Sequence, residues 1–280
     1  MNVAITGASG FLGRALSERL RASGRSVTAI SLRTQPPPES FAGCQAVVHL
    51  AGEPVAQRWT ASARDRILNS RIQGTRSLVA GLRKHPPAVL VSASAVGYYG
   101  SRGDEILTED SPPSSDFLGQ VARGWEQEAR AAEQFGVRVV TPRIGVVLGR
   151  GGGALAQMLL PFRLGVGGRL GAGNQWMSWI ALDDLVSLIE FAITDAALRG
   201  PVNAVAPNPV TNAVFTRELA AVLHRPAIFP VPAFALKILF GEMSQILLGG
   251  QRAIPQAALR AGFQFRFVEL SEALRQIIAG

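Results

Sequence analysis

The stretch that most constrains this chain is its first fifteen residues, which carry three regularly spaced glycines. A short apolar run at positions 2–6 leads into these glycines, and leucines then follow at helical spacing. Strand, glycine turn and helix in this order form the setting in which backbone amides bind a diphosphate. The alternative is an ordinary strand-to-helix turn. The sequence predicts a dinucleotide site here, with the candidate cofactor-binding residues Gly7, Ser9, Gly10, Phe11, Leu12 and Gly13.

Each of the three glycines is expected to have a different role. Gly7 can take the tight turn without a steric penalty from a Cβ atom. Gly10 would let a diphosphate approach the backbone, and Gly13 would let the helix pack closely on the strand. The free amides and the positive end of the helix dipole would face the anion.

The predicted second strand, residues 27–32, indicates which dinucleotide is bound. Proteins that bind NAD place an acidic residue near the end of this strand to hold the ribose hydroxyls. Here Ser31 and Arg33 stand in that place without a carboxylate, so nothing repels a 2′-phosphate and Arg33 can pair with it. The alternative for Arg33 is a surface arginine after a strand. We expect NADP (NADPH) as the cofactor.

A third buried strand, residues 46–50, ends in a glycine-containing segment that is expected to border the nucleotide. Too few residues separate it from the second strand for a further strand–helix unit to fit. A long helix at 60–84 follows, and Arg71 on it is a candidate cofactor ligand, with a solvated surface position as the alternative. The candidate cofactor-binding residues of this region are Leu50, Ala51, Gly52, Glu53 and Arg71.

Small hydroxyl side chains follow the next predicted strand. Ser92 and Ser94 lie at the carboxyl end of a strand that should be central and parallel, which is where the sites of α/β proteins form. Ser94 and Tyr98 are the candidate catalytic residues, and Ser92 and Val146 complete the candidate cofactor set. The alternative is that Ser94 only caps the strand end and Tyr98 packs against the loop.

The remaining pattern of strands and helices predicts an α/β fold. Loops at 101–116 and 150–180 are expected on the substrate side, and Asp183 is expected to cap the helix that follows it. We expect a nucleotide-binding domain over residues 1–223 and a small, mainly helical domain over residues 224–280.

Composition excludes several classes of protein. Hydrophobic residues make up 48% and charged residues 17%, as in a globular chain. The net charge of +8 comes from dispersed arginines without an aromatic-rich basic module, which favours a generally basic surface over nucleic-acid binding. Cys44 is the only cysteine, so an intramolecular disulfide cannot form. We expect no nucleic-acid partner and no metal site.

Two further observations concern the location of the protein. The apolar residues at 228–240 are interrupted by prolines and a lysine, so the segment is too short and broken to span a membrane. The first residues carry no basic region of the kind that begins a signal peptide. We therefore expect a cytoplasmic protein with a small-molecule substrate and no membrane partner, and we leave a homodimer open.

Taken together, these residues resemble the extended short-chain dehydrogenase/reductases over essentially the whole chain. The resemblance rests on the glycine turn, the serines described above, Leu50-Ala51-Gly52 and Trp179-Ile180-x-x-Asp183-Asp184. A narrower likeness to the atypical epimerase-family proteins, which carry a C-terminal domain of unknown function, rests on Arg58-Trp59, Pro161-Phe162-Arg163-Leu164-Gly165 and Gly249-Gly250-Gln251-Arg252. The resemblance implies a Rossmann-like doubly wound sheet, NADP(H) binding and mostly unidentified substrates.

One departure from the family concerns proton transfer. The extended family uses Tyr-x-x-x-Lys, in which the lysine lowers the pKa of the tyrosine so that it can move a proton. Residues 117–123 lie where this motif should be and contain neither residue type. Ser94 matches the family's catalytic serine, whereas Tyr98 matches a tyrosine that is not the acid/base. The narrower group usually carries histidine where this chain has Ala181, which further weakens the transfer of its chemistry.

Two functions from different classes remain open at this point. The first is an NADP(H)-dependent oxidoreductase or epimerase with a non-standard active site, acting on a small carbonyl, hydroxyl or nucleotide-sugar-like compound. The second is a non-catalytic NADP(H)-binding sensor or protein-interaction module, linked to cell division by a label that some relatives carry. The missing Tyr/Lys pair supports the second, and the intact cofactor motif favours the first.

Overall fold

A computed structural model describes residues 1–279 and contains a seven-stranded parallel sheet. The strand order is β2-β1-β3-β4-β7-β11, and the short β5 also pairs with β7. The strands are β1 (Asn2–Thr6), β2 (Ser26–Ile30), β3 (Ala46–His49), β4 (Val89–Ser92), β5 (Ser94–Ala95), β7 (Arg138–Ile144) and β11 (Gly200–Ala204). The register places Thr6 beside both Ile30 and His49, so the carboxyl ends of β1, β2 and β3 meet.

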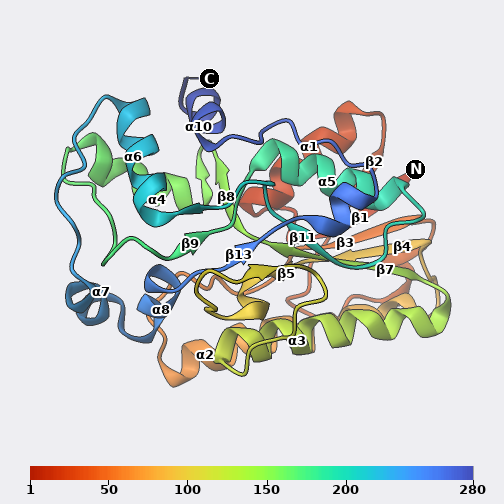
Figure 1. Cartoon of the computed structure of the whole chain (residues 1–280). Helices are drawn as coiled ribbons and strands as arrows, with labels where there is room; N and C mark the ends of the chain where they lie inside the picture. Colours follow the sequence, from red (N-terminus) through yellow and green to blue (C-terminus); the bar gives the residue numbers. More distant parts are fainter. Residues whose placement is uncertain (280) are drawn as a thin grey trace.

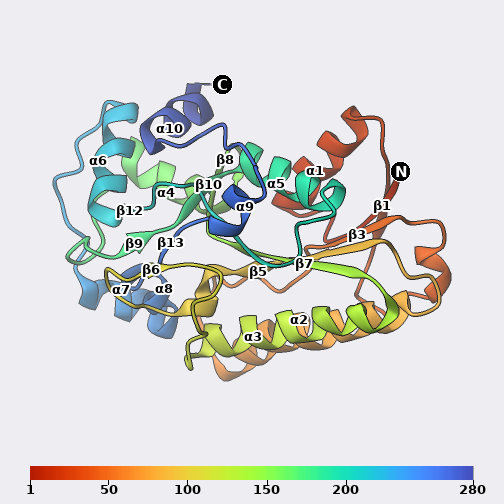
Figure 2. The same ribbon diagram turned by 45° about the vertical axis from the view of Figure 1, so that its right-hand side comes forward.

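Helices cover both faces of the sheet (Figures 1 and 2). One face carries α1 (Phe11–Ala22) and α5 (Leu182–Thr194), and the other carries α2 (Ala61–Leu82) and α3 (Phe117–Arg130). The alternation of side chains along β1 explains the two layers, because Val3 and Ile5 pack with α1 and α5 while Ala4 packs with α2. The predicted doubly wound α/β fold is confirmed.

A second, smaller core lies beyond the carboxyl ends of the strands, on the left in Figure 1. It is built from α4 (Gly153–Arg163), α6 (Asn212–Leu223), α10 (Leu270–Ala279), and the strand pairs β8 (Val146–Gly149) with β10 (Trp179–Ala181) and β9 (Trp176–Met177) with β12 (Val210–Thr211). Buried aromatic side chains of Trp179, Phe215 and Phe267 fill it. Because α10 packs against α6, the C-terminal residues complete this core. The domain boundary after residue 223 stays a prediction.

The segment after α6 returns to the sheet through short elements. These are α7 (Ala233–Phe240), α8 (Ser244–Leu248), β13 (Arg252–Ala253) and α9 (Gln256–Arg260). The 3-10 helices of the described residues are η1 (Pro38–Phe41), η2 (Val96–Tyr99), η3 (Ala131–Phe135) and η4 (Gly241–Met243). β13 pairs with β6 (Ile106–Leu107), which lies within the loop expected at 101–116. The C-terminal segment therefore holds this loop in place.

The connection between β2 and β3 contains only η1, as the short spacing predicted. β2 is consequently an edge strand, and the order of the chain reverses between β1 and β3. In open α/β sheets, ligands bind in the crevice that such a reversal creates at the carboxyl ends of the strands.

The expectation for Asp183 is wrong. Because β10 ends at Ala181 and α5 begins at the next residue, Ala181 is the N-cap and Asp183 lies in the first turn. Its charge still faces the positive end of the helix dipole there.

Candidate functional site

A cavity of about 300 Å³ opens at the crevice where the chain order reverses. Its wall contains eight of the residues predicted to bind cofactor or to act in catalysis, namely Gly7, Gly10, Phe11, Leu12, Gly13, Leu50, Arg71 and Ser94. Its other lining residues are Ala93, Ala95, Trp125 and Ile144. The glycine turn, the end of β3, the middle of α2 and the segment after β4 therefore share one cavity.

The glycine turn has a backbone geometry that explains its three glycines. Gly7 has a φ of 72°, and a Cβ there would lie 2.8 Å from backbone atoms of Leu50 and Ala51. A Cβ on Gly13 would lie 2.2 Å from the carbonyl oxygen of Gly7, so α1 packs this closely only without a side chain. At Gly10 the nearest described atom to a Cβ is that same oxygen, at 3.2 Å. Gly10 therefore leaves the start of α1 open to a ligand.

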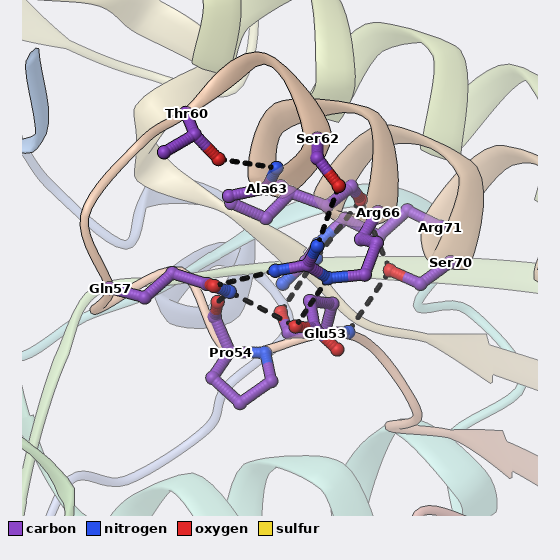
Figure 3. A network of polar contacts seen from close by, with 10 residues as sticks. Glu53, Pro54, Gln57, Thr60, Ser62, Ala63, Arg66, Ser70 and Arg71 are labelled. Carbon is purple, nitrogen blue, oxygen red and sulfur yellow. Dashed lines mark hydrogen bonds and ion pairs between the residues drawn. The ribbon is translucent and has the colours of Figure 1, made fainter.

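Arg71 brings a positive charge to the cavity without a carboxylate of residues 1–279 within 4.0 Å. Its guanidinium donates to the backbone carbonyls of Glu53, at 3.0 Å, and Ile67, at 3.2 Å. The Glu53 carboxylate instead accepts hydrogen bonds from Gln57 and Arg66 (Figure 3). Burial lowers the pKa of Arg71 to about 10, which leaves it charged at neutral pH. A partly buried cation of this kind favours an anion beside it.

A series of buried hydrogen bonds lies next to the glycine turn. Nδ1 of His49 lies 2.6 Å from Oγ1 of Thr6, and Nε2 lies 2.9 Å from Oγ1 of Thr75. The Thr6 oxygen also accepts hydrogen bonds from two backbone amides just after β3. Burial, and then the charge of Arg71, lowers the pKa of His49 to about 3, so the ring stays neutral. These hydrogen bonds join β1, β3 and α2 at the cavity wall, and they were not predicted from the sequence.

Ser94 is held by a buried ion pair. Its hydroxyl donates to Oε1 of Glu126 over 2.7 Å, and Arg143 donates to both oxygens of that carboxylate over 2.8 and 2.9 Å. The Arg143 and Glu126 side chains are only 3% and 4% exposed. Because an ionised carboxylate only accepts hydrogen bonds, the hydrogen of Ser94 is committed to Glu126. The oxygen of Ser94 therefore has lone pairs left to accept a hydrogen bond.

Both tyrosines lie against the same arginine. The guanidinium carbon of Arg143 is 3.6 Å from the centroid of the Tyr98 ring, and Arg143 donates to the Tyr99 hydroxyl over 2.8 Å. Tyr99 donates to Asn203 over 2.6 Å, and burial raises the pKa of Tyr99 to about 12. Tyr98 does not line the cavity. The Tyr99 phenol thus stays protonated at neutral pH and is committed to structural partners.

Glu126 and Arg143 were not predicted from the sequence, although the position of Glu126 on an apolar helical face could have pointed to it. The buried face of α3 carries Ala122, Glu126 and Ala129 at helical spacing. A carboxylate in the middle of an apolar helical face needs a buried partner. The sequence offers no comparable pattern that selects Arg143 as that partner.

The remaining predicted residues lie outside the cavity lining: Ser9, Ser31, Arg33, Ala51, Gly52, Glu53, Ser92, Tyr98 and Val146. Ser31 and Arg33 are exposed and follow β2, which pairs with β1 up to the start of the glycine turn. Ser92 is fully buried, and its Oγ has no hydrogen-bond partner in the described part of the chain. Val146 pairs with Trp179 and packs against the second core. Roles of these residues toward a cofactor stay predictions.

The parallel sheet, the reversal of strand order and the glycine turn at that reversal place the chain in the Rossmann-like class of nucleotide-binding α/β proteins. The chain belongs to the NAD dependent epimerase/dehydratase family, which it matches over residues 3–204. Residues 231–277 match a second family, described as a domain of unknown function, DUF1731. The resemblance stated from the sequence is confirmed.

Relatives are similar over nearly their whole length. "Epimerase family protein SDR39U1 homolog, chloroplastic" from Arabidopsis thaliana is 41% identical, with 99% of this chain and 87% of the relative covered. Epimerase family protein YfhF from Bacillus subtilis is 39% identical, with 100% and 98% covered. The crystal structure of human epimerase family protein SDR39U1 with NADPH is 37% identical, has a TM-score of 0.92 and covers 100% of both chains.

Residues 1–279 contain neither a helix suited to span a membrane nor a cluster of side chains suited to bind a metal ion. None of the described helices combines the length and the apolar character needed to cross a membrane. In the same residues, no group of three or more histidine, cysteine or acidic side chains is placed to hold a metal ion.

Proposed function

We propose that this protein binds NADP(H) and uses it as an oxidoreductase or epimerase on a small organic substrate. The observation that carries the proposal is the cavity that joins the open start of α1 with the Arg71 charge. A dinucleotide diphosphate supplies the anion that both features favour. The NADPH in the crystal structure of the human relative supports this choice of cofactor. When bound, the nicotinamide ring gives or takes a hydride.

The strand order suggests how the chain would hold the cofactor. Backbone amides at the start of α1 would bind the diphosphate, with Arg71 adding charge. Ser31 and Arg33 follow β2 on one side of β1, so they would face the adenosine end. Leu50 and Ser94 follow β3 and β4 on the other side, so they would border the nicotinamide end.

Arg71 and Arg66 form a matched pair on α2 for testing the anion site. Arg71→Met should weaken NADPH binding by about 10- to 100-fold, because a hydrogen bond to a charged group contributes roughly 1.5–3 kcal/mol. Arg66→Met removes an arginine that pairs with Glu53 outside the cavity and should leave binding nearly unchanged. Isothermal titration calorimetry measures both. Equal affinities of the two variants for NADPH would place the phosphates elsewhere.

Arg33 is expected to determine the choice between the two dinucleotides. NADPH should bind more tightly than NADH, and Arg33→Asp should remove most of this difference. The difference in binding free energy should be about 1.5–3 kcal/mol, because that is what a charge-assisted hydrogen bond contributes. Fluorescence titration with both nucleotides measures the preference. Equal affinities of the unmutated protein for NADPH and NADH would contradict the prediction.

Ser94 is the only hydroxyl-bearing side chain in the cavity lining of the described residues. Its free lone pair would accept a hydrogen bond from a substrate hydroxyl, while Glu126 keeps the side chain in place. Residues 117–123, where the family's Tyr/Lys pair is expected, contain neither tyrosine nor lysine. We therefore expect hydride transfer to be slow near neutral pH, or to be coupled to a proton that comes from water or from the substrate.

Loss of NADPH absorbance with a panel of aldehydes, ketones and nucleotide sugars tests the catalytic proposal. Ser94→Ala should abolish any turnover found and leave the affinity for NADPH nearly unchanged. Full turnover by this variant would remove Ser94 from the mechanism.

A non-catalytic binding role is the second candidate, and the missing Tyr-x-x-x-Lys pair favours it. NADPH binding without turnover of any compound in the panel is the result expected for such a sensor or interaction module.

A further inference from the structure

The most exposed apolar side chains of the molecule are concentrated on one surface. Eight large apolar side chains of residues 1–279 are 60–73% exposed, among them Leu164, Ile228, Phe229, Phe234, Ile238 and Leu239. All eight belong to residues 160–169 and 226–240, which we call the α4–α7 surface. Every other exposed large apolar side chain of the described residues is at most 52% exposed. Such concentration marks a binding surface, unlike the scattered exposure that is normal.

The two segments of the α4–α7 surface lie side by side. The backbone amide of Val231 donates to the carbonyl of Arg169 over 2.8 Å, and the amide of Gly171 donates to the carbonyl of Val231 over 2.9 Å. Gly168 lies directly against the backbone of Phe229. In both ribbon views the connection from α6 to α7 runs along the left edge of the molecule (Figures 1 and 2). The two segments that carry the apolar side chains therefore meet along residues 168–171 and 229–231.

Positive charges accompany these apolar side chains. Arg163, Arg169, Arg225 and Lys237 are exposed, and none lies within 4.0 Å of a carboxylate of residues 1–279. The sequence contains no aspartate or glutamate between positions 134 and 182, or between 219 and 241. A second copy of the same surface would place like charges opposite each other, which disfavours self-association.

A hollow of about 280 Å³ lies at the border of this surface, against α6. Arg169 and Arg217 line it next to Ile228. Arg217 pairs with Glu218, but at 70% exposure such a pair is weak. Two guanidinium groups beside exposed apolar side chains suit a phosphate headgroup next to an acyl chain.

We propose that the α4–α7 surface docks onto a lipid bilayer that contains anionic lipids. Phe234 and Ile238, one turn apart on α7, would insert at the level of the headgroups, and Lys237 and the arginines would contact lipid phosphates. Side chains that project from a short helix and a loop suit a fluid bilayer better than a packed protein interface, where lysine is depleted. The expectation of no membrane partner considered only spanning segments, and docking requires none.

Vesicle co-sedimentation of the full chain tests the proposal. The protein should bind vesicles of phosphatidylcholine mixed with phosphatidylglycerol at least about tenfold more tightly than phosphatidylcholine alone, and added salt should weaken this binding. The double variant Phe234→Glu/Ile238→Glu should lose binding by at least about tenfold. Ile106→Glu changes an exposed apolar side chain outside this surface and is the matched control, which should bind normally. Circular dichroism verifies that each variant is folded.

Three results would overturn the proposal. The first is a protein that stays in the supernatant with both kinds of vesicle, and the second is equal binding to both, which would remove the role of the charges. The third is a protein that does not bind vesicles but self-associates in analytical ultracentrifugation, with the double variant abolishing this self-association. The surface would then contact a second copy of the protein. None of these measurements depends on NADPH, so their outcome is separate from that of the proposed function.

Discussion

In the Gly10→Val variant, NADPH binding should fall by at least about a hundredfold while the fold remains, since several charge-assisted hydrogen bonds of roughly 1.5–3 kcal/mol each would be lost. The reason is local. A Cβ on Gly10 meets one described protein atom within 4 Å, the carbonyl oxygen of Gly7 at 3.2 Å, so a shift of a few tenths of an ångström accommodates it. The valine would instead fill the space at the start of α1 that a diphosphate requires. Isothermal titration calorimetry gives the affinity, and circular dichroism confirms the fold.

Gly74→Val is the matched control for this substitution. Gly74 lies in α2, and a Cβ there would have no described atom of a neighbouring element within 4 Å. This variant should bind NADPH as the unmutated protein does. Normal NADPH binding by Gly10→Val would show that the diphosphate does not lie on the glycine turn.

The second large effect is expected on stability. Glu126→Ala should lower the free energy of unfolding by about 3–5 kcal/mol, because it leaves the buried guanidinium of Arg143 without its carboxylate. Both oxygens of Glu126 accept hydrogen bonds from Arg143, and the pair is almost completely buried. Urea denaturation followed by circular dichroism measures the change.

The same helix provides the control. Glu128 also accepts two hydrogen bonds from an arginine, Arg76, but the Arg76 side chain is 57% exposed. Glu128→Ala should therefore cost less than about 1 kcal/mol. If the two alanine variants unfold at the same urea concentration, the buried pair does not stabilise the protein in the way we describe.

Features that depend on a few neighbouring residues could be predicted from the sequence. The roles of Gly7 and Gly13 follow from a positive φ and a close approach, which are requirements of the turn itself. The long helix predicted at 60–84 is observed at Ala61–Leu82, and Thr60 caps it by accepting a hydrogen bond from the Ala63 amide. The absence of a strand–helix unit between β2 and β3 could be predicted from the small number of residues between the two strands.

Features that depend on how distant elements pack could not be predicted in the same way. Trp125 lines the cavity because α3 packs against α2 and β4, which places the Trp125 ring beside His49 of β3. Its own sequence pattern only places it on a buried helical face. The link from Ser94 through Glu126 to Arg143 joins a strand end, a helix and β7. Ser92 is the last residue of β4 and is fully buried, so it does not line the cavity.

Under the proposed roles of Ser31, Arg33 and Arg71, the position of β2 at the edge of the sheet would separate the choice of cofactor from the affinity for it. Ser31 and Arg33 follow this strand and are exposed to solvent, where charges more than about 10 Å apart are screened at 0.1 M salt. Arg71 and the glycine turn lie in the cavity wall, where screening is weaker. The preference for NADPH over NADH should therefore shrink with rising ionic strength faster than dinucleotide affinity does. Because Ser31 and Arg33 are exposed, we expect their substitution to change that preference without repacking the core.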